Sequence, residues 1–392
     1  MHAALVDTAL PTTELHVRIT PTTTTQCPQI TANQQGFGYP CAYTATPPAA
    51  VAQTTSTTLF SNHYRAPAVQ RASLVLEREV GRHAEVRAGY SMALATQLPQ
   101  SVDLNIAPST VAANFVLQGG QHNDETFVVP LYTARPIAQY GAVTALVSNA
   151  NATYHAFTAE ATVRGTRSLE VRGSYTFSRA IDYGPQSSAT PGINGQFDPF
   201  RDGYDRGLSS LHVPQRFSGD LMYALDLKRG PELLRRALSG WRMAAIAVAG
   251  SGAPYSYAVF GGTRLSGGRE TINGSGGATY LPTVGRNTLR LPPRSRVDLR
   301  LGREFTVGSR LRVNAFAQAF NLGNTRNVSN IETRAYVVGT PANAGAPTPL
   351  IFQDAAEIAT EGLSTPAFGT PTSSTTGASR ERQVELGLRV QF

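Results

Sequence analysis

The side chains that could carry out catalysis are few in this chain and lie far apart. Its seven histidines stand at positions 2, 16, 63, 83, 122, 155 and 212, and none belongs to a His-Glu-x-x-His zinc motif. No Gly-x-Ser-x-Gly run is present to hold a nucleophilic serine on a sharp turn. The run from Gly262 to Gly267 has phosphate-loop spacing, but Gly268 and Arg269 follow where a lysine and a hydroxyl residue are needed. We therefore expect no enzyme, no nucleotide site and no cofactor.

An acidic cluster that suggests a metal contains Asp198, Asp202 and Asp205. Calcium prefers carboxylate oxygens as ligands, but this spacing is not that of an EF-hand loop. Arg201 and Arg206 lie beside these carboxylates in the sequence, and we expect ion pairs with them in a surface loop. The sequence therefore predicts no metal site.

Cys27 and Cys41 are the two cysteines of the chain, in a segment rich in threonine and proline. They lack the Cys-x-x-Cys pairs and nearby histidines of a zinc site. In an oxidising compartment they would form a disulfide that closes a loop of about 15 residues, worth ~3 kcal/mol through the unfolded chain. Two unrelated free thiols are the alternative.

The charge of the chain is basic but dispersed. Its formal net charge is +8, and the arginines are spread one or two per predicted strand without a nucleic-acid recognition motif, so we expect no nucleic-acid partner. The most apolar run, from Met243 to Ala249, is far shorter than the ~18 residues of a membrane-spanning helix. A membrane protein of this composition has to cross the bilayer with alternating strands, half of whose residues face a polar interior.

Alternation of apolar and polar residues recurs along the chain and predicts β-strands. Val297 and Leu299, for example, alternate with Asp298 and Arg300. We find about nine such segments: residues 71–80, 83–94, 154–163, 168–181, 215–225, 241–255, 294–307, 310–320 and 380–392.

The connections between these segments are alternately short and long. The short ones, at 80–83, 164–167 and 307–310, each contain a glycine and predict tight hairpin turns. The long ones are rich in Gly, Pro, Ser, Thr and Asn, and we expect them to lack regular structure: residues 96–150, 182–213, 256–292 and 321–379. Soluble domains seldom need several such loops, whereas outer-membrane barrels combine short periplasmic turns with long outer loops. The sequence thus predicts an all-β fold, an antiparallel transmembrane β-barrel.

The placement of aromatic residues agrees with a barrel whose short turns lie in the periplasm. We expect outward-facing aromatic residues at the two membrane interfaces: Trp241, Phe305 and Phe392 at the lower one, and Tyr90, Tyr175 and Phe177 at the upper one. One lower connection is longer, and Pro231 near its start and Gly240 at its end predict a short helix. This helix should cover the periplasmic rim, with partner binding as the alternative.

The last strand ends in a recognisable pattern. Glu385 is followed by Gly387, then by Val390 and a terminal Phe392. This arrangement resembles the signal by which the barrel-assembly machinery of bacteria recognises outer-membrane barrels. The resemblance implies that machinery and outer-membrane lipid as partners, and an ordinary amphipathic edge strand is the alternative.

Six further phrases precede the terminal strand in a specific order: Ser174–Asp182, Val213–Phe217, Leu238–Trp241, Arg296–Leu301, Ala319–Asn327 and Phe368–Pro371. Together they resemble the carboxy-terminal half of TonB-dependent receptor-like proteins of the Oar type, which carry an amino-terminal carboxypeptidase-regulatory-like domain. The resemblance covers roughly residues 60–392. It implies a bacterial outer-membrane barrel of about 22 strands, an internal plug domain, and energised uptake through a periplasmic TonB-type coupling protein.

The chain departs from that family pattern, because it has no plug, no coupling box and fewer than half of the strands. We expect residues 67–392 to form the carboxy-terminal part of the barrel. Residues 1–66 are expected to be a polar extracellular loop, with 13–19 as a candidate first strand. Met1 to Asp7 is not a secretory signal, which suggests a reading frame that begins part-way through a longer protein.

The expected function is therefore the barrel segment of a receptor or transporter for an unknown substrate, incomplete and not competent for transport alone. Its implied partners are the missing plug and barrel half and the coupling protein. A structural or adhesive outer-membrane barrel that does not transport is the alternative, and a soluble secreted β-protein is a third hypothesis.

The predicted sheet has three testable properties. Strands adjacent in sequence should pair, all antiparallel, in one curved sheet of nine or ten strands. The sheet should stay open, because a family built around a larger circumference has the wrong shear for early closure. A small closed barrel, with residues 13–19 as a tenth strand, is the alternative. Seven charged side chains should share the inner face: Glu170, Arg172, Arg216, Asp298, Arg300, Glu385 and Arg389.

Overall fold

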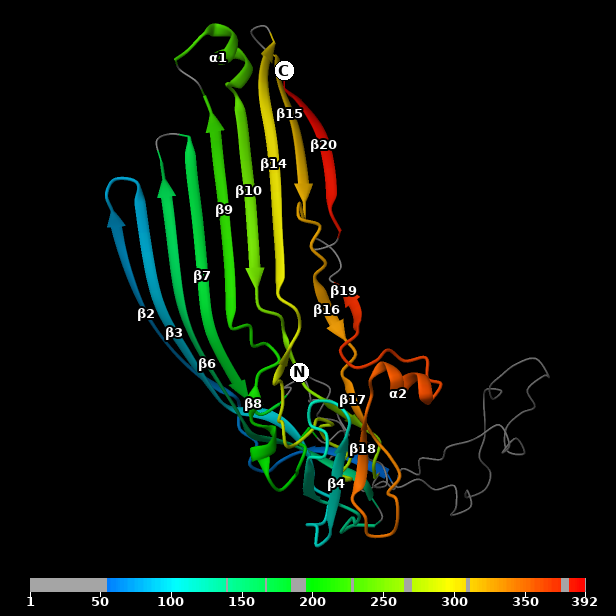
Figure 1. Cartoon of the computed structure of the whole chain (residues 1–392). Coiled ribbons are helices and arrows are strands. Elements are labelled where there is room, and N and C mark those ends of the chain that lie inside the picture. Colours follow the sequence, from blue (N-terminus) through cyan, green and yellow to red (C-terminus); the bar gives the residue numbers. More distant parts are fainter. Residues whose placement is uncertain are drawn as a thin grey trace, which may run out of the picture.

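The computed structural model describes residues 55–391, apart from residues 139, 166–167, 185–194, 227–228, 264–269, 308–310 and 375–380. Its largest part is one sheet whose main path contains nine strands, which stand side by side in Figure 1. Their order is β2-β3-β6-β7-β9-β10-β14-β15-β20, so strands that follow one another along the predicted barrel are neighbours in space. All eight contacts along this path are antiparallel. The predicted all-β antiparallel sheet is confirmed.

Each of the nine predicted segments is a strand of this path. The bounds are β2 (Ala68–Val80), β3 (Ala84–Asp103), β6 (Tyr140–Arg164), β7 (Leu169–Asp182), β9 (Gln215–Leu225), β10 (Trp241–Gly250), β14 (Arg294–Val307), β15 (Leu311–Phe320) and β20 (Gln383–Gln391). Two short strands pair beside the path: β1 (Thr55–Phe60) with β6, and β8 (Gly207–Leu208) with β7.

The strands β3 and β6 are much longer than predicted. They remain paired as far as Asp103 and Thr144, with irregularities in the register near Leu98. In this extension Gln100, Ser101 and Val102 are all buried. Because both faces of the extension are covered, its residues do not alternate between apolar and polar, and the signal that identified the rest of each strand is missing.

The long connections are folded, so the expectation that they lack regular structure is wrong. Their main element is a five-stranded sheet in the order β12-β17-β18-β4-β5, at the bottom of Figure 1. The strands involved are β4 (Ala112–Gln118), β5 (Thr126–Pro130), β12 (Ala258–Phe260), β17 (Arg334–Val338) and β18 (Thr348–Phe352). Two strand pairs join them: β11 (Pro254–Tyr255) with β13 (Leu289–Arg290), and β16 (Val328–Ile331) with β19 (Pro371–Ser374). We call the described residues of 104–138, 195–214, 251–293 and 321–374 the outer-loop unit.

The outer-loop unit has its own hydrophobic core. Phe197, Leu281 and Tyr336 are fully buried there, although they come from three different connections. Tyr257 stacks on Phe368 with ring centroids 5.2 Å apart, which joins two connections through one aromatic contact. Each connection contributes only a few apolar residues, so no single one predicts a core.

Three strand pairs are parallel, against the expectation of none. They are β1 with β6, β4 with β18, and β12 with β17. The pairs β4–β18 and β12–β17 join segments from different connections, and β1 joins the edge of the extension of β6, so no parallel pair belongs to the nine-strand path itself. No hairpin joins the two members of such a pair, so nothing in the chain forces them to be antiparallel.

The helices are short. The helix α1 (Glu232–Leu238) lies where a helix was predicted, between β9 and β10, at the end of the sheet that carries the short turns (Figure 1). The helix α2 (Ala355–Thr360) begins after Asp354, whose carboxylate accepts hydrogen bonds from the backbone of Ala356 and Glu357, both 2.9 Å. A 3-10 turn, η4, covers Asp202–Asp205. In the described part of the chain, no helix has the length and apolar character needed to span a bilayer.

Candidate functional site

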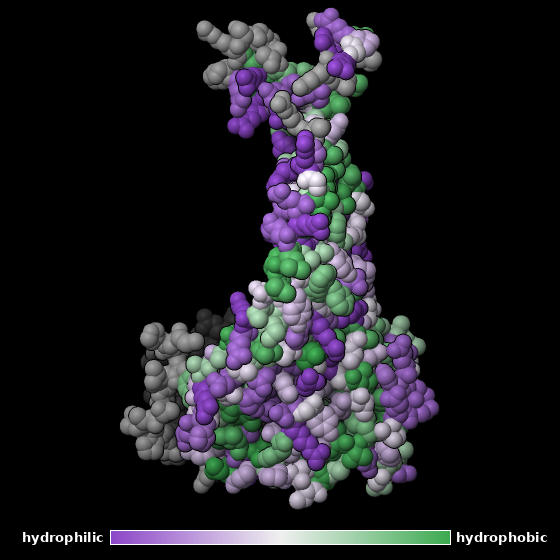
Figure 2. All heavy atoms as spheres, turned by 90° about the vertical axis from the view of Figure 1, so that its left-hand side faces the viewer, coloured by the Kyte–Doolittle hydropathy of each residue, from purple (hydrophilic) through white to green (hydrophobic). Residues whose placement is uncertain are grey.

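The nine-strand sheet has one charged and one apolar face, because directly opposed residues on paired strands point to the same side. Arg172 on β7 lies opposite Asp220 on β9. Asp220 lies opposite Ile246 on β10, and Ile246 lies opposite Asp298 on β14. By the register of the next two strand pairs, Gln318 on β15 and Glu385 on β20 lie on the same face. The prediction that seven charged residues share a face is confirmed: they are Glu170, Arg172, Arg216, Asp298, Arg300, Glu385 and Arg389. Figure 2 views the upright sheet from its β2 side, and hydrophilic and hydrophobic residues lie on opposite sides of it.

Cross-strand ion pairs cover the charged face. Arg87 lies 2.7 Å from Glu77 on one neighbouring strand and 3.6 Å from Glu160 on the other. Further along, Arg172 lies 3.3 Å from Asp220. These side chains are substantially exposed, so water competes with the ion pairs. Such a face is suited to line a water-filled interior.

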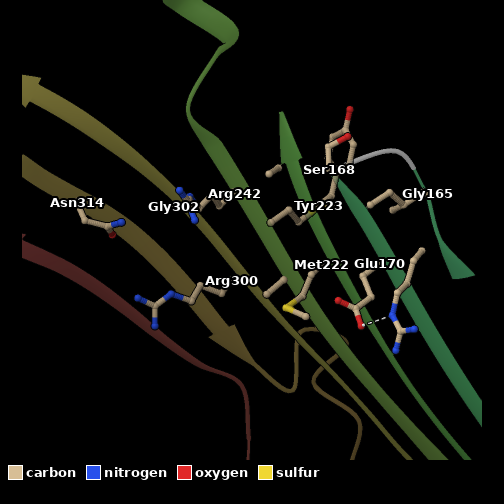
Figure 3. Close-up of a pocket in the computed structure, with 14 residues that line it drawn as sticks. Gly165, Ser168, Glu170, Met222, Tyr223, Arg242, Arg300, Gly302 and Asn314 are labelled. Carbon is tan, nitrogen blue, oxygen red and sulfur yellow. Dashed lines mark ion pairs between the residues drawn. The ribbon is translucent and has the colours of Figure 1, made fainter. Parts of the chain in front are cut away.

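A shallow groove of about 580 Å³ lies on the charged face, near the short turns (Figure 3). Ala224, Ala244 and Gly302 line it, and their small side chains leave the sheet uncovered there. Arg242 and Arg300 lie along it on adjacent strands.

The charges around this groove are only loosely neutralised. Arg164 lies 3.8 Å from Glu170, and Arg242 lies 3.8 Å from Glu304. Arg300 instead donates a hydrogen bond to the amide oxygen of Gln318 at 3.2 Å. The groove can therefore attract anionic groups, but its open form shows no enclosed catalytic pocket.

The apolar face carries aromatic residues at its two ends. Toward the outer-loop unit, Tyr90, Phe157 and Phe177 oppose one another across three strands, and Tyr175 opposes Phe217. At the short-turn end, the guanidinium of Arg303 lies 5.6 Å from the ring centroid of Trp241 and 4.8 Å from that of Phe305. The predicted separation of aromatic residues to opposite ends of the strands is confirmed for those described.

The two outermost strands of the nine are open at their outer edges. In the described residues, β2 pairs along this path only with β3, and β20 only with β15. Because the path is antiparallel and contains an odd number of strands, β2 and β20 run in the same direction. Direct pairing between them would be parallel. The prediction that the sheet stays open is confirmed for the part of the chain that the structure describes.

The residues of the predicted assembly signal lie on both faces of β20. Glu385 accepts a hydrogen bond from Gln318 on the charged face, and Gly387 lies opposite Phe316 there. Val390 opposes Val313 on the apolar face and is exposed. Phe392, the cysteines Cys27 and Cys41, and the candidate strand 13–19 lie outside the described residues. Recognition by the assembly machinery stays a prediction.

Two carboxylates of the acidic cluster, Asp198 and Asp205, are buried instead of lying at the surface, whereas Asp202 is exposed, and the partners of the buried two are not the expected arginines. Asp205 accepts hydrogen bonds from the hydroxyl of Tyr280 at 2.8 Å and from the backbone of Phe197 at 3.1 Å. Asp198 accepts one from the hydroxyl of Tyr132 at 2.7 Å. Among the described residues, neither carboxylate pairs with Arg201 or Arg206 as predicted. In the outer-loop unit, hydrogen bonds from residues of other connections stand where ion pairs between sequence neighbours were predicted.

Burial dominates the electrostatics of this cluster. It raises the pKa of Asp205 to about 6, although the bonds from Tyr280 and Phe197 and the charge of Arg286 act in the opposite direction. Burial and the adjacent Asp205 carboxylate raise the pKa of Tyr280 above its usual range. Within the described residues, no group of three His, Cys, Asp or Glu side chains could hold a metal ion.

Two buried ion pairs, which the sequence did not indicate, connect the outer-loop unit to the sheet. Arg286 forms a charge-assisted bond to Asp182 at the end of β7 and also donates to the backbone oxygen of Asp205 at 3.1 Å. Arg135 lies 2.8 Å from Asp103 at the end of β3. Both pairs join residues far apart in the sequence, so no local motif marks them.

Among solved structures, the chain is similar to the outer membrane transporter YddB from Escherichia coli, with 12% identity and a TM-score of 0.41, over 76% of this chain and 33% of that one. It is also similar to the FrpB iron transporter from Neisseria meningitidis, with 11% identity and a TM-score of 0.39, over 85% of this chain and 32% of that one. The chain thus spans about a third of the length of each. No curated protein matches it.

The family comparison covers nearly the whole chain. The model of the outer membrane beta barrel domain matches residues 6–385. This range contains eight strands of the main path completely and the beginning of β20. The chain therefore belongs to the outer membrane beta barrel domain family, and it is a protein of the bacterial outer membrane.

Proposed function

We propose that the nine-strand sheet is one section of the wall of a larger barrel, belonging to a TonB-dependent receptor-like transporter of the Oar type. The observation that carries this proposal is the direction of the edge strands. An antiparallel barrel closes only when its two edge strands run in opposite directions, and β2 and β20 run in the same direction. An odd number of further strands between them would give antiparallel pairing throughout.

The two faces of the sheet support a position in such a wall. The charged face would line the interior, and the apolar face would contact lipid. Leu386 on β20 is 82% exposed, and Leu76 on β2 is exposed too, which is costly in water and favourable in a bilayer. Unpaired backbone groups at the two edges would be costly in lipid, so the edges need further strands.

The order of phrases from Ser174–Asp182 to the terminal strand supports the receptor-like assignment, and with it energised uptake through a periplasmic coupling protein. In this assignment the short turns face the periplasm and the outer-loop unit faces the exterior. The barrel-assembly machinery would recognise the end of β20. The chain itself would carry out no catalysis and would not transport alone.

Conductance tests this proposal directly. The full chain, supplied with a signal peptide and purified from outer membranes, would be added to a planar lipid bilayer. We expect no stable single-channel steps, because the open sheet encloses no pore. Regular steps of uniform size would show that the chain closes a pore without further strands and would contradict the proposal. A protease-resistant sheet in the same preparation is the control for folding.

A structural or adhesive role is the second candidate, and the outer-loop unit favours it. Its core contains Phe197, Leu281 and Tyr336, so the unit can present a rigid surface. Cells that display the chain would then adhere to a surface or to other cells. Replacing residues 104–138 by a short hairpin should remove this adhesion, whereas unchanged adhesion would argue against the role.

A further inference from the structure

Three described arginines of the sheet, Arg78, Arg303 and Arg179, point to the apolar face, and of these three only Arg179 lies toward the outer-loop unit. It opposes His155, in line with Phe157 and Phe177, and therefore points to the apolar face. Most arginines of the sheet lie on the charged face, and several of them have carboxylate partners. Arg179 is exposed, and among the described residues no carboxylate lies within ion-pair distance of it. A cation on the lipid-facing side needs a reason to be there.

The height of Arg179 along the strands is well defined. Trp241 on β10 marks the lower aromatic level. Ala249 on the same strand lies opposite Phe217, which marks the upper level. The distance along β10 between these two residues is about 26 Å, at ~3.3 Å per residue. With a tilt of about 40°, this corresponds to ~20 Å of membrane thickness, close to the apolar band of a barrel once the rings are included. Arg179 lies two residues beyond Phe177 and four beyond Tyr175, which opposes Phe217, so on the same scale it is about 5 Å above Phe177 and about 10 Å above the level of Phe217. That is the headgroup region.

His155 adds a second donor beside Arg179. Its Nδ1 atom lies 2.8 Å from the hydroxyl of Tyr90. When that hydroxyl donates to Nδ1, the ring proton is on Nε2, which is then available to a ligand. The opposed positions of His155 and Arg179 place their Cβ atoms ~5 Å apart, a separation that suits one phosphate group between the two side chains.

The surroundings are also positive. The pKa of His212, in the connection between β8 and β9, is lowered first by burial and then by the charges of Arg290 and Arg179. Two cations close together repel each other, and an anion between them relieves the repulsion. Phosphate, with several acceptor oxygens and a full negative charge, matches guanidinium and imidazole donors.

We propose that Arg179 and His155, with Tyr90 orienting the imidazole, bind the phosphate of a lipid headgroup in the outer leaflet. The outer leaflet of a bacterial outer membrane is rich in phosphorylated lipid A, which offers such phosphates at this height. The aromatic residues Tyr90, Phe157 and Phe177 lie directly below and contact the acyl chains. The site requires the outer-loop unit to face the exterior, but it does not depend on transport.

Native mass spectrometry of the full chain tests this site. The protein would be extracted from outer membranes, together with any strands that complete its barrel, and titrated in detergent micelles with diphosphoryl lipid A. We expect Arg179→Gln to weaken lipid A binding at least tenfold, and His155→Gln to weaken it severalfold. Arg179→Lys keeps the charge and should bind within about threefold of the natural chain.

Arg216→Gln is the matched control. Arg216 opposes Thr176, three residues from Arg179 along the strand, and it lies on the charged face. Its substitution should leave lipid A binding unchanged. Equal binding by Arg179→Gln and the natural chain would overturn the proposal, and so would equal loss in Arg216→Gln.

Two further probes identify the ligand chemistry. Dephosphorylated lipid A should bind the natural chain as weakly as lipid A binds Arg179→Gln. Inorganic phosphate alone should compete poorly, because it lacks the acyl chains that contact the aromatic row. Tight binding of inorganic phosphate without preference for lipid A would contradict a lipid site.

Discussion

The ring of Phe316 packs directly over Gly387 on the neighbouring strand. A Cβ atom at position 387 would lie under 3 Å from three carbons of that ring, so only glycine fits. The guanidinium of Arg300 also lies over the ring of Phe316, with its central carbon 3.8 Å from the ring centroid. The glycine of the predicted assembly signal therefore also has a packing role in the folded sheet, since it lets β15 cover the charged face of β20 with an aromatic ring.

The first prediction concerns this contact. Gly387→Ala should destabilise the sheet by about 1–3 kcal/mol, because the added methyl group overpacks the space under Phe316. Unfolding by urea in micelles, followed by the fluorescence of the single tryptophan, Trp241, would measure it. Gly302 also opposes Phe316, but a Cβ there would meet its neighbours at an ordinary 3.4 Å. Gly302→Ala should change stability much less, and Phe316→Leu should restore much of the loss in Gly387→Ala.

The second prediction concerns the open edges. In a chain with Cys27→Ser and Cys41→Ser, cysteines at Leu76 and Leu388 should form no disulfide on oxidation, because β2 and β20 are edges of the described sheet and do not pair. Reducing and non-reducing gels would show the result. A disulfide within one chain would indicate closure of the nine strands, and a covalent dimer would indicate pairing between copies.

The positive control for that experiment is a pair known to be opposed. Ser73 and Ser91 face each other on β2 and β3, and cysteines at these positions should cross-link readily. If this control also failed to form a disulfide, β2 would not occupy its place in the sheet at all, which would contradict the register described here.

The nine membrane strands could be predicted because one physical rule governs every residue in them. Each strand has one polar and one lipid-facing side, so apolar and polar residues alternate along most of its length, and the type of a residue such as Val297 or Asp298 indicates which face it lies on. The same rule predicted the charged face and the separation of the aromatic levels. It failed in the extension of β3 and β6, where burial on both sides removes the alternation.

The outer-loop unit could not be predicted, because its contacts connect distant segments. Tyr280 and Asp205 are 75 residues apart, and Arg286 and Asp182 are 104 residues apart. A local pattern indicated only loops rich in glycine and proline, and the ion pairs expected from neighbours in the sequence were wrong for the same reason. Asp205 was expected to be a charged residue at the surface, but in the structure it is buried and accepts hydrogen bonds. This burial results from the tertiary fold and cannot be seen in the local sequence.

The third prediction compares a buried with an exposed ion pair. Arg286→Gln should destabilise the attachment of the outer-loop unit by ~3–5 kcal/mol, because it leaves the carboxylate of Asp182 buried without a charged partner. The two side chains are only 7% and 9% exposed. Arg87→Gln, at an exposed pair, should change stability much less than Arg286→Gln, because water competes with an exposed ion pair. Hydrogen exchange of residues 195–214 would measure the first effect, and urea unfolding the second. Equal effects of the two substitutions would contradict the burial described here.

The last prediction concerns pH. The pKa of Asp205 in the folded unit is raised by burial to about 6, from 3.8 for the exposed group. For a group whose folded pKa is raised, the stabilising contribution is complete below the unfolded pKa and is lost as pH rises through the folded one. The outer-loop unit should therefore resist protease better at pH 5 than at pH 7.5. The shift corresponds to roughly 3 kcal/mol.

Tyr280→Phe provides the sharper form of this test. The hydroxyl of Tyr280 donates to the charged form of Asp205, so its removal should raise the pKa of that carboxyl further. The midpoint of the pH-dependent loss of resistance should then move to higher pH. Tyr255→Phe is the control and should leave the midpoint unchanged, because Tyr255 belongs to the same connection but is not a hydrogen-bond partner of Asp205. A midpoint that stays in place in Tyr280→Phe would show that another group, not Asp205, governs the pH dependence of the unit.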